Sequence, residues 1–195
     1  MAADSKVIDM DRGVLSKTKL FRLTDNCVAA IAGMGLKDDL DTFMATLEAD
    51  IADKNIQGVS SIAKHVKEFT ENRGWAEWDD PNKSHMIVMI GGYDGSVPKV
   101  FIRLSTGVLE GLGFGRYVIG NWDGAVDYLV EAFQKKTYKK IDFTTAEKVS
   151  IEMLVKGELA NPAQIGGQGT LWHIHSRRTE TKSATYIAKL QERYV

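Results

Sequence analysis

The run His85–Tyr93, with the sequence HMIVMIGGY, decides the fold, because it is the strongest strand pattern in the chain. A continuous apolar run of this length is typical of a buried strand. The turn residues Asp94 and Gly95 follow it, and Lys99–Leu104 has the pattern of a return strand. The middle of the chain is therefore predicted to form a β-hairpin.

A second hairpin and two helices are predicted before this run. Lys19–Leu23 alternates polar and apolar residues, and a turn at residues 24–26 leads into the apolar run Cys27–Ala32. Apolar residues then recur at helical spacing over Asp38–Asp53 and over Val59–Asn72. Each of these helices has one apolar face, so both are expected to pack against a sheet.

The same two kinds of pattern continue after the central hairpin. Residues 108–120 form a strand region interrupted by glycines, and Asp123–Gln134 has a helical apolar stripe. Another helix is expected to open at Thr144, because Thr144 and Glu147 are close to a capping box. The last clear strand is predicted over Thr170–His175.

The order along the chain is strands, two helices, strands, two helices and a strand. Hairpins and blocks of helices argue against a parallel doubly wound sheet and favour antiparallel sheets covered by helix pairs. The prediction is one α+β domain over residues 1–178, followed by a helical tail over residues 179–195.

The composition limits the kinds of molecule that the chain is expected to bind. The 195 residues include 25 Lys and Arg against 26 Asp and Glu, so charge gives no reason to expect nucleic acid or a membrane surface. No apolar run approaches the roughly 20 residues of a membrane helix, and the first residues lack the pattern of a secretion signal. The single cysteine, Cys27, is predicted to be buried, and we expect a cytoplasmic protein.

Short sequence motifs lie at or near the boundaries between the predicted elements. They are Met1–Asp4, Ser16–Leu23, Ile31–Gly33, Ile90–Asp94, Tyr117–Asn121 and Phe143–Glu147. In this order and spacing they resemble the proteasome β-subunit family, the threonine-type members of the N-terminal-nucleophile hydrolases. The resemblance implies a four-layer α-β-β-α sandwich, in which helix pairs flank two antiparallel sheets.

The resemblance also implies a set of catalytic positions. In that family the nucleophile is the hydroxyl of an N-terminal threonine, and the α-amine of that threonine acts as the base. The family's lysine corresponds to Lys19 and its acidic residue to Asp4, while its loop serine falls at Asn121 and a later aspartate falls near Ala163. The threonine has no counterpart, because the sequence starts where the family's first strand is expected to have ended.

Three functions stay open at this point. The first is a non-catalytic proteasome β-like subunit that assembles with itself or with related subunits into a ring-like oligomer. The second is an N-terminally truncated form of a threonine-type peptidase or amide hydrolase, which would act on peptides only in a longer form. The third is an unrelated α+β binding protein. The residues at 121 and 163 favour the first function, whereas Asp4 and Lys19 favour the second.

Because the family's first strand has no counterpart, we expect another element to cover the surface that this strand would occupy. Without it, a sheet edge or a core face would be left uncovered, which is unfavourable. We therefore expect a strand over Val7–Met10, a partner chain, or marginal stability. A well-folded monomer without such cover would contradict this expectation.

Two further pairs of residues have alternative interpretations. His173 and His175 lie two apart on a predicted strand, so they share one face of it. A metal would need a third and a fourth ligand, which no Cys or His cluster supplies, so we expect no metal, no cofactor and a polar, exposed sheet face. Trp75 and Trp78 lie in a polar loop and predict either a protein interface or rings packed back onto the helices.

Overall fold

The fold comes from a computed structural model, which describes residues 1–3, 6–9, 13–34, 40–73, 85–104, 106–112, 119, 142–163 and 165–194. The chain divides into two compact units. The first unit contains residues 1–19, 121–173 and 180–195, and the second contains residues 20–120 and 174–179. Helices and antiparallel strands occur together, which confirms the predicted α+β class.

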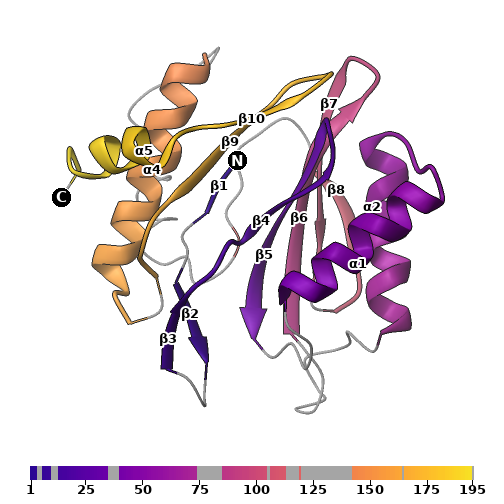
Figure 1. The fold of residues 1–195 in the computed structure, drawn as a ribbon, viewed down its shortest axis with the longest axis horizontal. Helices are drawn as coiled ribbons and strands as arrows, with labels where there is room; N and C mark the ends of the chain where they lie inside the picture. The colour runs from indigo at the N-terminus through magenta and orange to yellow at the C-terminus, as the bar shows by residue number, and fades with distance from the viewer. Residues whose placement is uncertain are drawn as a thin grey trace. The chain divides into compact units, whose positions relative to one another are not determined.

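The second unit is built on a five-stranded antiparallel sheet in the order β4-β5-β6-β7-β8 (Figure 1). Each strand pairs with the next strand along the chain, and both predicted hairpins are confirmed. The strands are β4 (Leu20–Thr24), β5 (Cys27–Met34), β6 (His85–Asp94), β7 (Val97–Arg103) and β8 (Leu109–Leu112).

Two helices, α1 (Leu40–Asp53) and α2 (Val59–Asn72), cover one face of this sheet (Figure 1). The register pairs Ala29 of β5 with Ile90 of β6, which places both side chains on that face. The face and the apolar stripes of the two helices form one core. Its buried residues are Leu23, Cys27, Ala29, Ile31, Phe43, Met44, Leu47, Ile51, Val59, Ile62, Ala63, Val66, Met86, Val88 and Ile90.

The opposite face of the same sheet is buried as well. Val28 and Ala30 of β5 alternate with the residues that face the helices, and Met89 of β6 pairs with Ala30. All three side chains are buried, as is Leu20 of β4, which pairs with Ala30 from the other side. A sheet with two apolar faces is typical of an inner layer.

The first unit contains a three-stranded sheet in the order β1-β9-β10 and a separate hairpin of β2 and β3. Two helices, α4 and α5, contribute with β9 to a second core, whose buried residues are Ile151, Leu171, Ile187 and Leu190. The elements are β1 (Ala2–Ala3), β2 (Lys6–Asp9), β3 (Gly13–Ser16), α4 (Phe143–Ala160), β9 (Thr170–Ile174), β10 (Thr179–Thr181) and α5 (Ala184–Gln191).

Some boundaries differ from the expectations. Asp142, and not Thr144, caps α4, because the Asp142 carboxylate accepts a hydrogen bond from the Thr145 N–H at 2.7 Å. An aspartate in extended backbone directly before the helix can accept from the first turn, whereas Thr144 is already inside the helix. A strand is present at β2, one residue before the expected Val7–Met10, but it pairs with β3 in a two-stranded sheet of its own and not with an edge of either larger sheet. The tail expected to be helical begins as strand β10.

Several predictions lie outside the described residues, namely the helix at 123–134, most of the strand region at 113–120, and the loop with Trp75 and Trp78.

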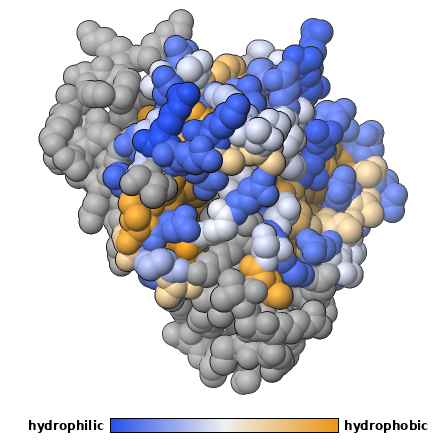
Figure 2. Space-filling model, turned by 60° about the vertical axis from the view of Figure 1, so that its left-hand side comes forward, coloured by the Kyte–Doolittle hydropathy of each residue, from blue (hydrophilic) through white to orange (hydrophobic). Residues whose placement is uncertain are grey.

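No helix in the described part of the chain is long and apolar enough to cross a membrane. On the face drawn in Figure 2, the described residues are mostly hydrophilic, and the hydrophobic ones form small separate patches.

Candidate functional site

Of the three site residues that the resemblance implies, the structure gives a position to Lys19 alone. Lys19 lies directly before β4 and is half-buried. Asp4 and Asn121 fall outside the described residues, so nothing places them beside Lys19. Ala163, near the position of the family's later aspartate, lies in the turn after α4 and is exposed.

The described residues of the first unit instead centre on a buried carboxylate, Glu147 of α4, which is 5% exposed. Its Oε1 lies 2.8 Å from Nε2 of His173 and 3.1 Å from Nζ of Lys182. The Tyr186 hydroxyl donates a hydrogen bond to Oε2 at 2.5 Å. A buried carboxylate is costly unless it is paired and hydrogen-bonded, and these three partners satisfy that condition.

Local structure explains why these groups meet. The Asp142 cap fixes the first turn of α4, and Phe143 and Glu147, four residues apart, then share one face of the helix. The Phe143 ring stacks on the His173 ring with centroids 4.6 Å apart. On β9, Leu171 belongs to the core of the first unit, and His173, two residues later, lies on the same side of the strand.

The partners of Glu147 set its ionisation. Burial alone would raise the pKa of the Glu147 carboxyl, but the hydrogen bonds from Tyr186 and Lys182, with the charges of Lys182 and His173, hold that pKa below its ordinary value. The hydrogen bond to Glu147, aided by burial, raises the pKa of Tyr186. At neutral pH the carboxylate is therefore ionised, and the phenol keeps its proton as a fixed donor.

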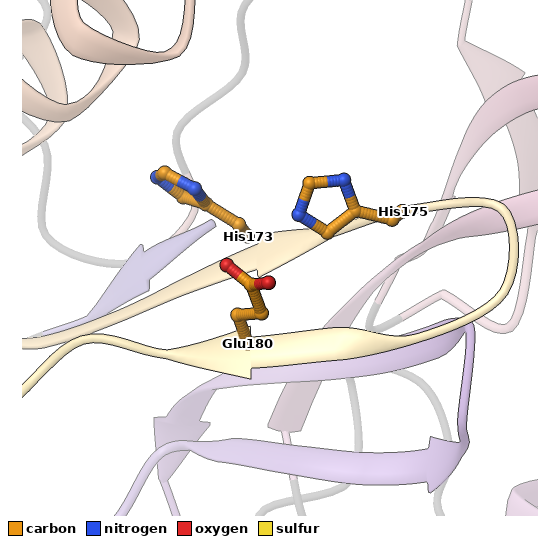
Figure 3. Close-up of side chains that lie close together, drawn as sticks. All are labelled: His173, His175 and Glu180. Carbon is orange, nitrogen blue, oxygen red and sulfur yellow. The ribbon is translucent and has the colours of Figure 1, made fainter.

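A second group of polar side chains, which shares His173 with the first, lies on the β9–β10 hairpin. Two backbone hydrogen bonds define the register of this hairpin. They run from the N–H of His175 to the carbonyl of Arg178 and from the N–H of Lys182 to the carbonyl of Leu171. In this antiparallel register His173 faces Glu180. Figure 3 shows the side chains of His173, His175 and Glu180 on the same side of the hairpin.

These three residues bring together atoms that can bind a metal. One potential ligand atom from each of His173, His175 and Glu180 lies within 4.8 Å of the other two. All three belong to one continuous run of eight residues, so the hairpin by itself positions them. Two imidazoles and a carboxylate form a ligand set that occurs in catalytic zinc sites and in non-haem iron sites.

The sequence predicts this arrangement only in part. The prediction that His173 and His175 share a face is confirmed (Figure 3). The predicted exposure is wrong for His173, which is 8% exposed because α4 covers it with Phe143 and Glu147. Glu180 is missed because its position depends on the pairing of β9 with β10, and the sequence pattern predicts no strand after residue 175.

Cys27 is confirmed as a buried residue of the core. Burial, together with the negative charge of Asp94, raises the pKa of its thiol to about 12. Because the thiolate and not the thiol is the nucleophile, Cys27 acts as a packing residue.

Comparison with known proteins does not assign the chain to a family. No family model matches it, and no curated protein matches it significantly.

Proposed function

We propose that this chain is a proteasome β-like subunit, non-catalytic in this form, which acts through assembly with itself or with related subunits. The observation that carries the proposal is the order of the elements. A hairpin, a helix pair and further antiparallel strands form the second unit, and α4, β9 and α5 share the core of the first unit. Over the described residues this order agrees with the one that the resemblance implies, while the helix expected over 123–134 lies outside them.

The two apolar faces of the five-stranded sheet support a finer proposal, the four-layer α-β-β-α sandwich. In such a sandwich each inner sheet carries helices on one face and the other sheet on its second face. Helices α1 and α2 occupy one face here, and Val28, Ala30 and Met89 make the second face apolar. The core of the first unit likewise combines strand β9 with helices α4 and α5.

Two residues support the non-catalytic form. The family's loop serine corresponds to Asn121, and its later aspartate falls near Ala163. Neither side chain offers the same chemistry, because asparagine has no hydroxyl and alanine has no carboxylate. A subunit that needs the fold for assembly and not for hydrolysis can accept both changes.

The mass of the purified chain in solution tests this proposal. We expect light scattering to give a defined multiple of the 21.6 kDa chain mass, stable on dilution. Fluorogenic peptides should not be hydrolysed at a rate that depends on Lys19. A chain that stays monomeric over a wide concentration range and is inert toward peptides would contradict the proposal and favour the binding-protein function.

A second candidate, threonine-type amide hydrolysis in a longer form, is favoured by the retained Lys19. A lysine ammonium close to the α-amine of an N-terminal threonine would lower the pKa of that amine and help it to act as the base. A longer form that begins with threonine should then hydrolyse peptides, and Lys19→Ala should abolish the activity. Equal activity in that form with and without Lys19→Ala would exclude this candidate.

A further inference from the structure

We propose that the β9–β10 hairpin binds a divalent metal ion of the zinc class through His173, His175 and Glu180. This inference does not rest on the proteasome-like function, since it involves none of the residues that support that function. It follows from the register of one hairpin, the chemistry of three side chains and the carboxylate that holds one of them.

His173 and Glu180 face each other across the strand pair, and residues in such a position have Cβ atoms about 5 Å apart. His175 lies on the same side one step further along (Figure 3). The potential ligand atoms already lie within 4.8 Å of one another. Zinc bonds of about 2.0–2.1 Å at tetrahedral angles require ligand atoms roughly 3.3 Å apart. Rotation of the His175 and Glu180 side chains can supply this closure while the backbone and the His173 ring stay in place.

The two imidazoles and the carboxylate favour a metal of the zinc class over magnesium or calcium. Neutral imidazole nitrogens suit zinc, copper, iron and nickel, whereas magnesium and calcium prefer sites made wholly of oxygen. Three protein ligands leave a fourth position for water or another small molecule, as in catalytic zinc sites and unlike closed structural ones. His175 and Glu180 are partly exposed, whereas His173 is buried.

A buried carboxylate, Glu147, lies beside the ring of His173. Metal-binding histidines usually have a second ring nitrogen on a carboxylate or carbonyl, which fixes the tautomer and the orientation of the ring. Nε2 of His173 lies 2.8 Å from Oε1 of Glu147, so the proposal assigns the metal to Nδ1. The stacked Phe143 ring restricts the imidazole further. Glu147 is thus a positioning residue, and Tyr186 and Lys182 hold it in place.

The test uses the full chain without an affinity tag, stripped of metal by a chelator and titrated with Co²⁺ and then Zn²⁺. We expect one equivalent of Co²⁺ to bind with visible d–d absorption bands, and Zn²⁺ to displace it. Competition with a chromophoric chelator should show that His175→Ala and Glu180→Gln each weaken Zn²⁺ binding by at least tenfold. Glu192→Gln, which removes an exposed carboxylate after α5, should leave the affinity unchanged.

Glu147→Gln provides the readout for the positioning role. It should weaken Zn²⁺ binding by about 10–100-fold while the shape of the Co²⁺ bands is retained, because the ligands themselves remain. In the unmodified chain, Zn²⁺ should shift the ring resonances of two of the four histidines, a measurement that needs no variant to fold. Less than one equivalent of metal, unshifted histidine resonances, or equal affinity in His175→Ala, Glu180→Gln and the control would overturn the proposal.

Discussion

Glu147 links three parts of the first unit through one side chain. It extends from α4, contacts His173 on β9, and meets Lys182, which lies just before α5, and Tyr186 in the first turn of α5. Removal of one partner from a buried charged group typically costs about 3–5 kcal/mol, because the other charge is left unpaired. The cluster therefore fixes how α4, β9 and α5 pack together, and it holds the ring of His173 in one orientation.

Asp94 in the second unit allows a prediction about pH. Its carboxylate accepts hydrogen bonds from the N–H and hydroxyl of Ser60, at 3.1 and 2.5 Å, and pairs with Nζ of Lys99 at 2.8 Å. Burial alone would raise the pKa of Asp94, but these contacts lower it to about 2. Because this pKa lies below that of the unfolded chain, the stabilisation is present above about pH 4 and is lost as the pH falls toward 2.

Urea unfolding between pH 6 and pH 2.5 measures this effect. We expect the free energy of unfolding to lose roughly 1–2 kcal/mol more in the unmodified chain than in Asp94→Asn over that range. Asp53→Asn, which changes an exposed aspartate at the end of α1, should keep the pH dependence of the unmodified chain. The same pH dependence in Asp94→Asn would show that the Ser60 and Lys99 contacts do not stabilise the folded state.

What the sequence reveals at this scale depends on how far apart the interacting residues are. Cys27 sits inside an apolar run, so its burial follows from its neighbours in sequence. Glu147 and His173 are 26 positions apart, and no local pattern indicates that α4 covers β9. The capping-box pattern at Thr144 and Glu147 also misleads the prediction of the contact between Glu147 and His173. It indicates that Glu147 caps its own helix, whereas Asp142 is the capping residue.

At the scale of elements, periodicity predicts most of the second unit. The apolar stripe over Val59–Asn72 has the bounds of α2, and the run at His85 becomes the central strand β6. Pairing is harder to predict than the elements themselves, because it depends on contacts between distant segments. The register of β9 and β10 brings Glu180 opposite His173, and this is the step that completes the candidate metal site.

The glycine in the centre of the sheet shows how closely these strands approach. A Cβ on Gly92 would lie 2.7 Å from the carbonyl oxygen of Asn26 and 3.1 Å from Cα of Cys27, and neither backbone atom can move away easily. Gly92→Ala should therefore destabilise the protein by about 1–3 kcal/mol, as overpacking usually does.

Gly111→Ala on β8 is the matched control for this substitution. Its new methyl group would meet the Phe101 ring at 3.4 Å, and the change should leave stability within about 0.5 kcal/mol or raise it slightly, because alanine restricts the unfolded chain. Denaturant unfolding compares the two variants. Equal effects would mean that β5 and β6 approach each other less closely than the structure indicates.

At the scale of the whole molecule, the sequence predicts the class of fold and the order of its elements but not how they group. The tail predicted as a separate segment contributes Ile187 and Leu190 to the core of the first unit. The two units each have a core of their own, and the first is assembled from three separate segments of the chain. Local patterns cannot show this grouping, because it is fixed by contacts between residues that are far apart in sequence.

The four-layer sandwich is the claim on which both assembly and hydrolysis depend. Layers in such a fold lie about 10 Å apart, so the axes of helices in the two outer layers are about 30 Å apart. Labels that project outward from α2 and from α4 should therefore be separated by roughly 30–45 Å. Two lysines, Lys64 of α2 and Lys148 of α4, are exposed and suit this purpose.

The deciding measurement is the distance between spin labels on Lys64→Cys and Lys148→Cys, in a Cys27→Ala background and diluted with unlabelled chain. A four-layer sandwich predicts a single narrow distribution centred at roughly 30–45 Å. A broad distribution, or a mean below about 25 Å as expected for helices packed in one layer, would contradict the sandwich and with it the proposed function.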